Sequence, residues 1–128
     1  MTLIKSKIKS ITTNTCPKCH QGAFFQTNNA YNLSKFDKMN SQCSVCHQDF
    51  ERETGFYYGA MYVSYGLTVG FGLILFVITH FLLHINDLDF IWIFPIVIIL
   101  LTPLFYRYAR LLWINLFVSY APAASKAN

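Results

Sequence analysis

Two Cys-x-x-Cys pairs, followed by two long uncharged apolar stretches, predict the fold class of this chain. We expect a small β-rich zinc ribbon, then an α-helical transmembrane hairpin of two membrane helices, and finally a C-terminal amphipathic helical segment. The expected domains are a basic N-terminal lead over 1–14, a zinc-ribbon module over 15–54, the hairpin over 55–106, and an interfacial helix with a mobile tail over 107–128.

The composition places most of the apolar residues in lipid. Hydrophobic residues make up 54% of the 128 residues and charged residues only 12%, whereas an ordinary soluble domain has about 25% charged residues. No Lys, Arg, Asp or Glu lies between Gly55 and Asn86, and none lies from Phe90 to Tyr106. Since a soluble chain of this size has too little polar surface to cover two such stretches, we expect both to cross a membrane.

The lead, residues 1–14, carries three lysines and an isoleucine repeat that fit either a helix or an extended segment. The lysines are expected to attract anionic lipid headgroups, at about 1 kcal/mol each near the surface. The lead lacks the apolar run of roughly 7–15 residues that a secretory signal needs, so we expect it in the cytoplasm. Because thiols stay reduced there, the paired cysteines are predicted to bind a metal rather than to form disulfides.

The module contains four candidate metal ligands, Cys16, Cys19, Cys43 and Cys46, with 23 residues between the two pairs. Each pair can close a turn that presents two sulfurs to one cation, and two such turns complete the tetrahedron that zinc adopts in structural sites. All four positions would then be filled, which leaves no open position for hydrolysis, and no catalytic residue is predicted. Iron bound by the same four sulfurs, as in a rubredoxin-like centre, is the alternative cofactor.

The module is too small to fold on apolar burial alone, so metal binding is expected to supply its folding free energy. Short strands near 21–25 and 49–51 are expected to pair. His20 and His47, which follow the second cysteine of each pair, are predicted to be hydrogen-bond donors around the site or surface residues rather than ligands. The expected thin core consists of Phe24, Phe25, Tyr31, Leu33, Phe36, Val45 and Phe50.

The first membrane helix is predicted over 55–85 and the second over about 88–106, antiparallel because a short turn joins them. The uncharged residues 55–79 would span about 37 Å as a helix, which exceeds a hydrocarbon core of roughly 30 Å. The tyrosine-rich start of this helix is therefore expected at headgroup depth. Small residues on one face, Gly59, Gly66 and Gly70, are expected to admit the second helix, with a homo-oligomer or a larger partner as alternatives.

The distribution of positive charge predicts the orientation. Seven Lys/Arg precede the first helix, Arg107 and Arg110 follow the second, and the turn between the helices has none. Under the positive-inside rule both termini face the cytoplasm. The segment that begins at Arg107 fits either an interfacial helix or a continuation of the second membrane helix.

His80 and His84 lie one helical turn apart near the end of the first helix, with Asp87 and Asp89 close by in the sequence. Polar residues of this kind are typical of a membrane boundary. The alternative is a second metal site for copper or zinc, because two imidazoles at this spacing can share an ion.

At its cysteine pairs the chain resembles the domain-of-unknown-function 983 family of small bacterial membrane proteins. The matching stretches are CPKCHQGAFF at 16–25, CSVCHQDFE at 43–51 and GFYYGA at 55–60. The resemblance covers about residues 10–120 and includes the hydrophobic hairpin and the arginine-containing tail. The family pattern usually has Gly where this chain has His20 and His47, a difference that leaves the four ligands intact. The resemblance implies a multi-pass zinc-ribbon protein of the bacterial inner (cytoplasmic) membrane, without an established activity.

The sequence shows no nucleophile with a base and no cofactor-binding loop, so a non-enzymatic protein is expected. Its predicted role is a protein-interaction or assembly module at the cytoplasmic face, bound to membrane lipid and to a membrane protein of unknown identity. A membrane-tethered electron-transfer protein with iron is the alternative. Zinc held by four thiolates lowers the formal net charge of +4 by two, which argues against a nucleic-acid partner because such a partner requires a concentrated basic patch.

Overall fold

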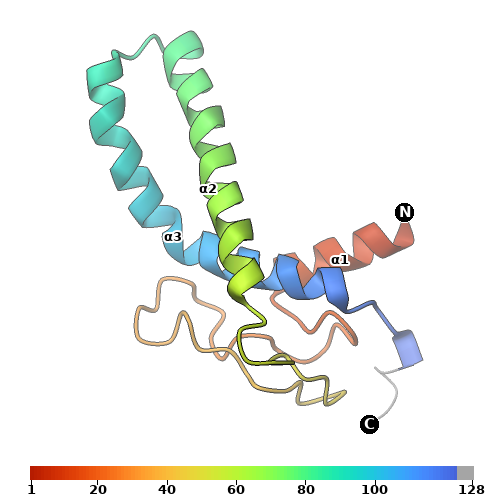
Figure 1. Ribbon diagram of the computed structural model, residues 1–128. Coiled ribbons are helices and arrows are strands. Elements are labelled where there is room, and N and C mark those ends of the chain that lie inside the picture. The colour runs from red at the N-terminus through yellow and green to blue at the C-terminus, as the bar shows by residue number, and fades with distance from the viewer. Residues whose placement is uncertain (124–128) are drawn as a thin grey trace.

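The fold consists of a projecting helical hairpin and an irregular cysteine-rich module at the base of the hairpin (Figure 1). The computed structural model describes residues 1–123. The elements in chain order are α1 (Thr2–Thr13), α2 (Tyr58–Val77), the π-helix η1 (Ile78–Leu82) and α3 (Asp87–Phe117). Residues 14–57, between α1 and α2, are called the cysteine module below.

The prediction of a β-rich ribbon is wrong, because residues 1–123 contain no strand and no sheet. The segments 21–25 and 49–51 do not pair with each other. Each Cys-x-x-Cys turn instead reverses the chain within a few residues, so that a bridge forms locally and has no room to extend into a ladder. The module has three isolated antiparallel bridges, Thr15–Ala23, Phe25–Met39 and Gln42–Asp49.

The hairpin contains two helical stretches that are long and apolar enough to cross a membrane, as the sequence predicts. α2 and η1 together cover 25 residues, Tyr58–Leu82, and α3 covers 31 residues, Asp87–Phe117. The two run antiparallel and project away from the module (Figure 1). Many of their apolar side chains point outward, for example Leu73, Phe81 and Ile99, which is the arrangement that a lipid solvent requires.

Helix α3 runs without interruption through residue 106, where the sequence predicts the end of the hairpin. Figure 1 shows α3 bent, with its C-terminal part turned across the base of α2. Pro95 and Pro103 lie inside the helix, and a proline removes one backbone hydrogen bond and permits such a bend. Of the two alternatives for the segment that begins at Arg107, the structure has a continuation of the second helix. A position of this segment at the bilayer surface stays a prediction.

The core lies between the cysteine module and the C-terminal part of α3. Phe24, Phe25 and Phe50 are fully buried, as expected, and Leu111 and Ile114 of α3 complete the cluster. The prediction that Tyr31 and Leu33 belong to the core is wrong, because their side chains are 53% and 76% exposed. They lie on the loop between the Phe25 and Met39 positions of a single bridge, which α3 contacts at Thr27 and Phe36 but not at these two side chains.

The glycines of α2 differ in how closely they approach α3. A β-carbon added at Gly59 would meet the Trp113 ring, whereas one added at Gly66 or Gly70 would meet nothing within 4 Å. The expectation that all three glycines admit the second helix is therefore wrong for Gly66 and Gly70. Gly72, which the sequence analysis did not select, does approach α3, at Phe94.

The N-terminal lead is a helix, so the structure decides between the two alternatives left open for it. Ser10 on α1 is fully buried, and its hydroxyl donates a hydrogen bond of 2.7 Å to the carbonyl of Thr15. Asn14 ends the helix in the left-handed conformation, with φ 56°. At the other end of the chain, the expected mobile tail falls partly on residues 124–128, which lie outside the described residues. Just before these residues the chain is hydrogen-bonded to the cysteine module, since the Ala121 amide donates to the Lys18 carbonyl.

Candidate metal centre

The four cysteines that the sequence selects converge on one point. Cys16, Cys19 and Cys43 are buried and Cys46 is half-buried. All four sulfurs lie within 4.8 Å of one another. They come from two turns that are far apart in the chain, so the fold of the module brings the two pairs together.

The sulfur separations fit a tetrahedral ion. The distance between Cys16 Sγ and Cys46 Sγ is 3.7 Å, and that between Cys19 Sγ and Cys43 Sγ is 3.6 Å. A tetrahedron with metal–sulfur bonds of about 2.3 Å has edges of about 3.8 Å. All four cysteines are free thiols. The side chains are therefore positioned to bind one metal ion through four sulfurs.

The two turns have closely similar backbones. In the first, the Cys16 carbonyl accepts from the His20 amide and the Cys16 amide donates to the Gly22 carbonyl. In the second, the Cys43 carbonyl accepts from the His47 amide and the Cys43 amide donates to the Gln48 carbonyl. The first of these hydrogen bonds is equivalent in the two turns, whereas the second spans six residues in the first turn and five in the second.

His20 and His47 occupy equivalent left-handed positions, with φ of 58° and 55°. This conformation favours glycine. Neither histidine belongs to the group of side chains that could hold the metal. The His20 ring instead stacks on Tyr120, with 4.3 Å between ring centroids, and its Nε2 lies 3.3 Å from Ser6 Oγ. Burial and the charge of Lys9 lower the pKa of His20.

The thiols differ in acidity before metal binds. Burial raises the pKa of Cys16 and, to a smaller extent, that of Cys46. Burial also acts to raise the pKa of Cys19, but hydrogen bonds from the Gly22 and Gln21 amides outweigh it and lower this pKa to about 7. Backbone amides directed at a sulfur stabilise a thiolate, so Cys19 is better prepared to bind a cation than Cys16 or Cys46.

Gly22 supports the centre in a way that the sequence analysis missed. A β-carbon at this position would lie 2.2 Å from Cys43 Sγ. The first turn therefore approaches the sulfur of the second turn across a gap that admits only a hydrogen atom. A glycine three residues after the second cysteine of a pair was the available signal, but the sequence does not show which atom faces it.

Arg107 also has a role that sequence reasoning did not predict. From the positive-inside rule, Arg107 would be expected to contact lipid headgroups. Its side chain is instead buried, with 6% exposed. The guanidinium lies over the Phe25 ring, 4.4 Å from the centroid, and Nη2 donates to the Thr27 carbonyl. Arg107 therefore fastens α3 to the module just beside the metal centre.

At the hairpin turn, His80 forms a pair with Asp87. His80 Nδ1 lies 3.2 Å from Asp87 Oδ1, in an exposed pair. Over the described residues 1–123, the cysteine quartet is the one group of three or more metal-binding side chains that converge. His84, with φ 51°, belongs to the turn itself. These residues are better explained as polar groups at the end of the hairpin.

Fold and site together define a class of protein: a four-cysteine metal module attached to the base of a hairpin of two apolar helices. A family model described as "Protein of unknown function (DUF983)" matches residues 33–117, and the chain belongs to this family. The match includes the second cysteine pair and both apolar helices, whereas Cys16 and Cys19 precede it. No curated protein and no solved structure matches the chain significantly.

Proposed function

We propose that this protein is a non-enzymatic, membrane-anchored metal module that binds another protein at the cytoplasmic face of the bacterial inner membrane. The resident metal is zinc, and the role is interaction or assembly within a membrane complex. The observation that carries this proposal is the position of a closed four-sulfur site directly at the base of an apolar hairpin.

A structural metal agrees with the geometry of the sulfurs. Four thiolates fill a tetrahedral ion and leave no position for a substrate. Three of the four cysteines are buried, and the adjoining core contains only a few large side chains, chiefly Phe24, Phe25 and Phe50. A module with so small a core depends on metal binding for much of its stability.

Helix α1 supports a position at the membrane surface. Leu3, Ile4 and Ile8 are exposed on it, together with Lys5 and Lys9. A helix with exposed apolar side chains and lysines is suited to the boundary between headgroups and acyl chains. The lysines also favour the cytoplasmic side under the positive-inside rule.

The loop between Phe25 and Met39 offers a surface for a protein partner. Tyr31 and Leu33 are exposed on the module, outside the hairpin and α1. Exposed aromatic and aliphatic side chains of this kind are common anchors in protein interfaces. Tyr31→Ser with Leu33→Ser should therefore remove a cross-linked or co-purified partner and leave the metal content unchanged.

Metal identity is tested on protein purified from its own host membranes. We expect one zinc per chain, a colourless sample, and loss of the metal in a variant with Cys16→Ser and Cys43→Ser. Iron, with a visible spectrum that bleaches reversibly on reduction, would replace the proposal with the electron-transfer alternative. Reporter fusions at both termini test the orientation, and activity of a periplasmic reporter at either terminus would contradict it.

A further inference from the structure

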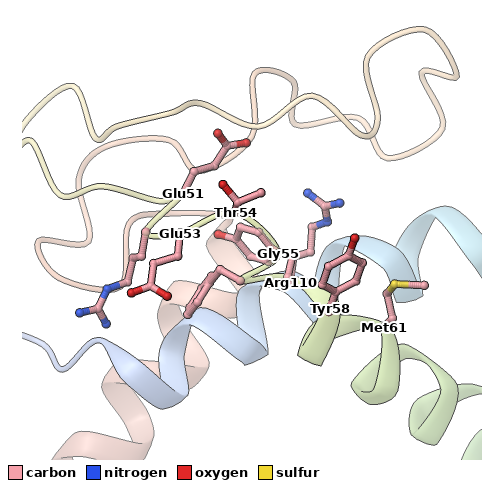
Figure 2. A pocket seen from close by; sticks show the side chains of 10 residues that line it. Glu51, Glu53, Thr54, Gly55, Tyr58, Met61 and Arg110 are labelled. Atoms are coloured by element: carbon pink, nitrogen blue, oxygen red, sulfur yellow. The ribbon is translucent and has the colours of Figure 1, made fainter.

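Two cavities meet at the base of the hairpin, outside the metal centre. The larger, of about 690 Å³, lies between residues 51–58 and α3 (Figure 2). The smaller, of about 360 Å³, lies between α2 and α3. Both are lined by Tyr57, Met61 and Arg110, so they adjoin at these side chains, and the two together are called the double cavity below. Each of the two parts is within the range of roughly 300–1,000 Å³ that is typical of small-molecule sites.

The two parts of the double cavity differ in character. The larger part is lined by two carboxylates, Glu51 and Glu53, and by two guanidinium groups, Arg52 and Arg110. Figure 2 shows Arg110 and Tyr58 on one side of it and the two glutamates on the other. The smaller part is lined by apolar and aromatic side chains of the two helices, Ala60, Tyr106 and Ala109 among them. The space is therefore charged at one end and apolar at the other.

Arg110 lies at the junction of the two parts and has hydrogen-bonding capacity to spare. Its guanidinium lies over the rings of Tyr57 and Tyr106, 4.9 and 4.4 Å from the centroids. Its one hydrogen bond, of 3.2 Å, is to Met39 Sδ, and a thioether is a weak acceptor. Within residues 1–123 no carboxylate lies within 4.0 Å of it. A half-buried guanidinium without a carboxylate is suited to bind a phosphate.

We propose that the double cavity binds one phospholipid whose headgroup carries both a phosphate and a primary ammonium, the phosphatidylethanolamine class. Arg110 binds the phosphate, Glu51 and Glu53 accept hydrogen bonds from the ammonium, and an acyl chain occupies the apolar part between α2 and α3. The proposal rests on the proposed membrane insertion, because only a bilayer-spanning hairpin places its base at headgroup depth.

The balance of charges selects this headgroup over two common ones. A purely anionic headgroup would pair with Arg52 and Arg110 but would leave Glu51 and Glu53 without a partner and be repelled by them. A choline headgroup has no N–H with which to donate to Glu51 or Glu53. An ethanolamine headgroup satisfies both ends of the charged part, with an ammonium that donates three hydrogen bonds.

Native mass spectrometry of the full-length, metal-loaded protein tests the proposal. The protein in detergent is titrated with phosphatidylethanolamine, phosphatidylcholine or phosphatidylglycerol of identical acyl chains. We expect one phosphatidylethanolamine to be retained, with an affinity about tenfold above that of the other two lipids, since charge-assisted hydrogen bonds are the strong ones. Arg110→Gln should lower this affinity about tenfold. The double variant with Glu51→Gln and Glu53→Gln should bind phosphatidylethanolamine and phosphatidylcholine alike.

His84→Gln, at the far end of the hairpin, is the matched control and should leave the lipid affinities unchanged. Equal retention of the three lipids by the wild type, or equal affinity of the wild type and Arg110→Gln, would overturn the proposal. If Arg110→Gln loses metal or helix content, the glutamate variant decides, since both glutamates are exposed. Alkaline carbonate extraction of membranes separates the two hypotheses: release of the protein rejects membrane insertion, whereas retention without a lipid preference rejects only the lipid site.

Discussion

Trp113 occupies the space that a side chain at residue 59 would need. A β-carbon at Gly59 would lie 2.0 Å from the Trp113 ring. The ring has little freedom to move, because its Nε1 donates a hydrogen bond of 2.8 Å to the Phe56 carbonyl and its face packs near Phe117. This contact joins the start of α2 to the C-terminal part of α3 and holds the base of the hairpin closed.

Gly59→Ala is therefore expected to destabilise the protein by about 1–3 kcal/mol, the usual cost of forcing extra atoms into a packed site. Gly66→Ala is the matched control, since that position is open. Because alanine is the better helix former, it should be neutral or stabilising by up to about 1 kcal/mol. Unfolding in detergent, followed by circular dichroism at the helix band, gives both values. Equal stability of the two variants would show that the contact with Trp113 is not tight.

Gly22→Ala is expected to weaken metal binding, because the added methyl group would collide with Cys43 Sγ. The sulfur cannot yield without leaving the tetrahedron. We expect a loss of affinity of about 10–100-fold, similar to the effect of changing the groups that orient metal ligands. Competition with a chromophoric chelator measures it, with Gly70→Ala, which is far from the module, as the control. An unchanged affinity would indicate that the two turns separate when metal binds.

Metal affinity is expected to rise with pH. Burial raises the pKa of Cys16 and of Cys46 above that of an ordinary thiol, so both are protonated at pH 7 in the metal-free protein. Each must release its proton to bind a cation, and acidification therefore favours the metal-free state. The logarithm of the affinity should increase by at least about two per pH unit between pH 6 and 8, because Cys16 and Cys46 each release a proton and Cys19, with a pKa of about 7, releases a further one in the lower part of this range. Chelator competition across that range measures the slope, and a pH-independent affinity would contradict this assignment.

His47→Gly is expected to stabilise the metal-bound module by up to about 1 kcal/mol, because glycine adopts a left-handed backbone without the penalty that His47 incurs at φ 55°. The His47 side chain is exposed, so little contact is lost.

His20→Gly is the informative comparison for this prediction. This substitution removes a similar strain from a left-handed backbone, at φ 58°. It also loses the stacking on Tyr120 and the contact with Ser6. Its gain should therefore be smaller, or replaced by a loss. Denaturant-induced metal release reports both variants, and a larger gain for His20→Gly than for His47→Gly would reverse the interpretation of the two positions.

The sequence by itself determined the features that depend on neighbours along the chain. Two Cys-x-x-Cys turns select the four sulfurs, because two ligands on one turn need only the local backbone. Uncharged stretches before and after the Asn86–Asp89 region predict the two long apolar helices, because transfer into lipid depends on composition. The resemblance at the cysteine pairs identified the family for the same reason, since its motifs are local.

The tertiary structure decided what depends on the bend of α3. Thr27 and Arg107 are 80 positions apart in the chain, and no periodicity relates them. Their contact places Leu111 and Ile114 over Phe24, Phe25 and Phe50, and leaves Tyr31 and Leu33 outside. The same bend brings Trp113 against Gly59 and Arg110 to the double cavity. The β-rich ribbon was wrong because the helix and the sulfurs, rather than a strand ladder, hold the module together.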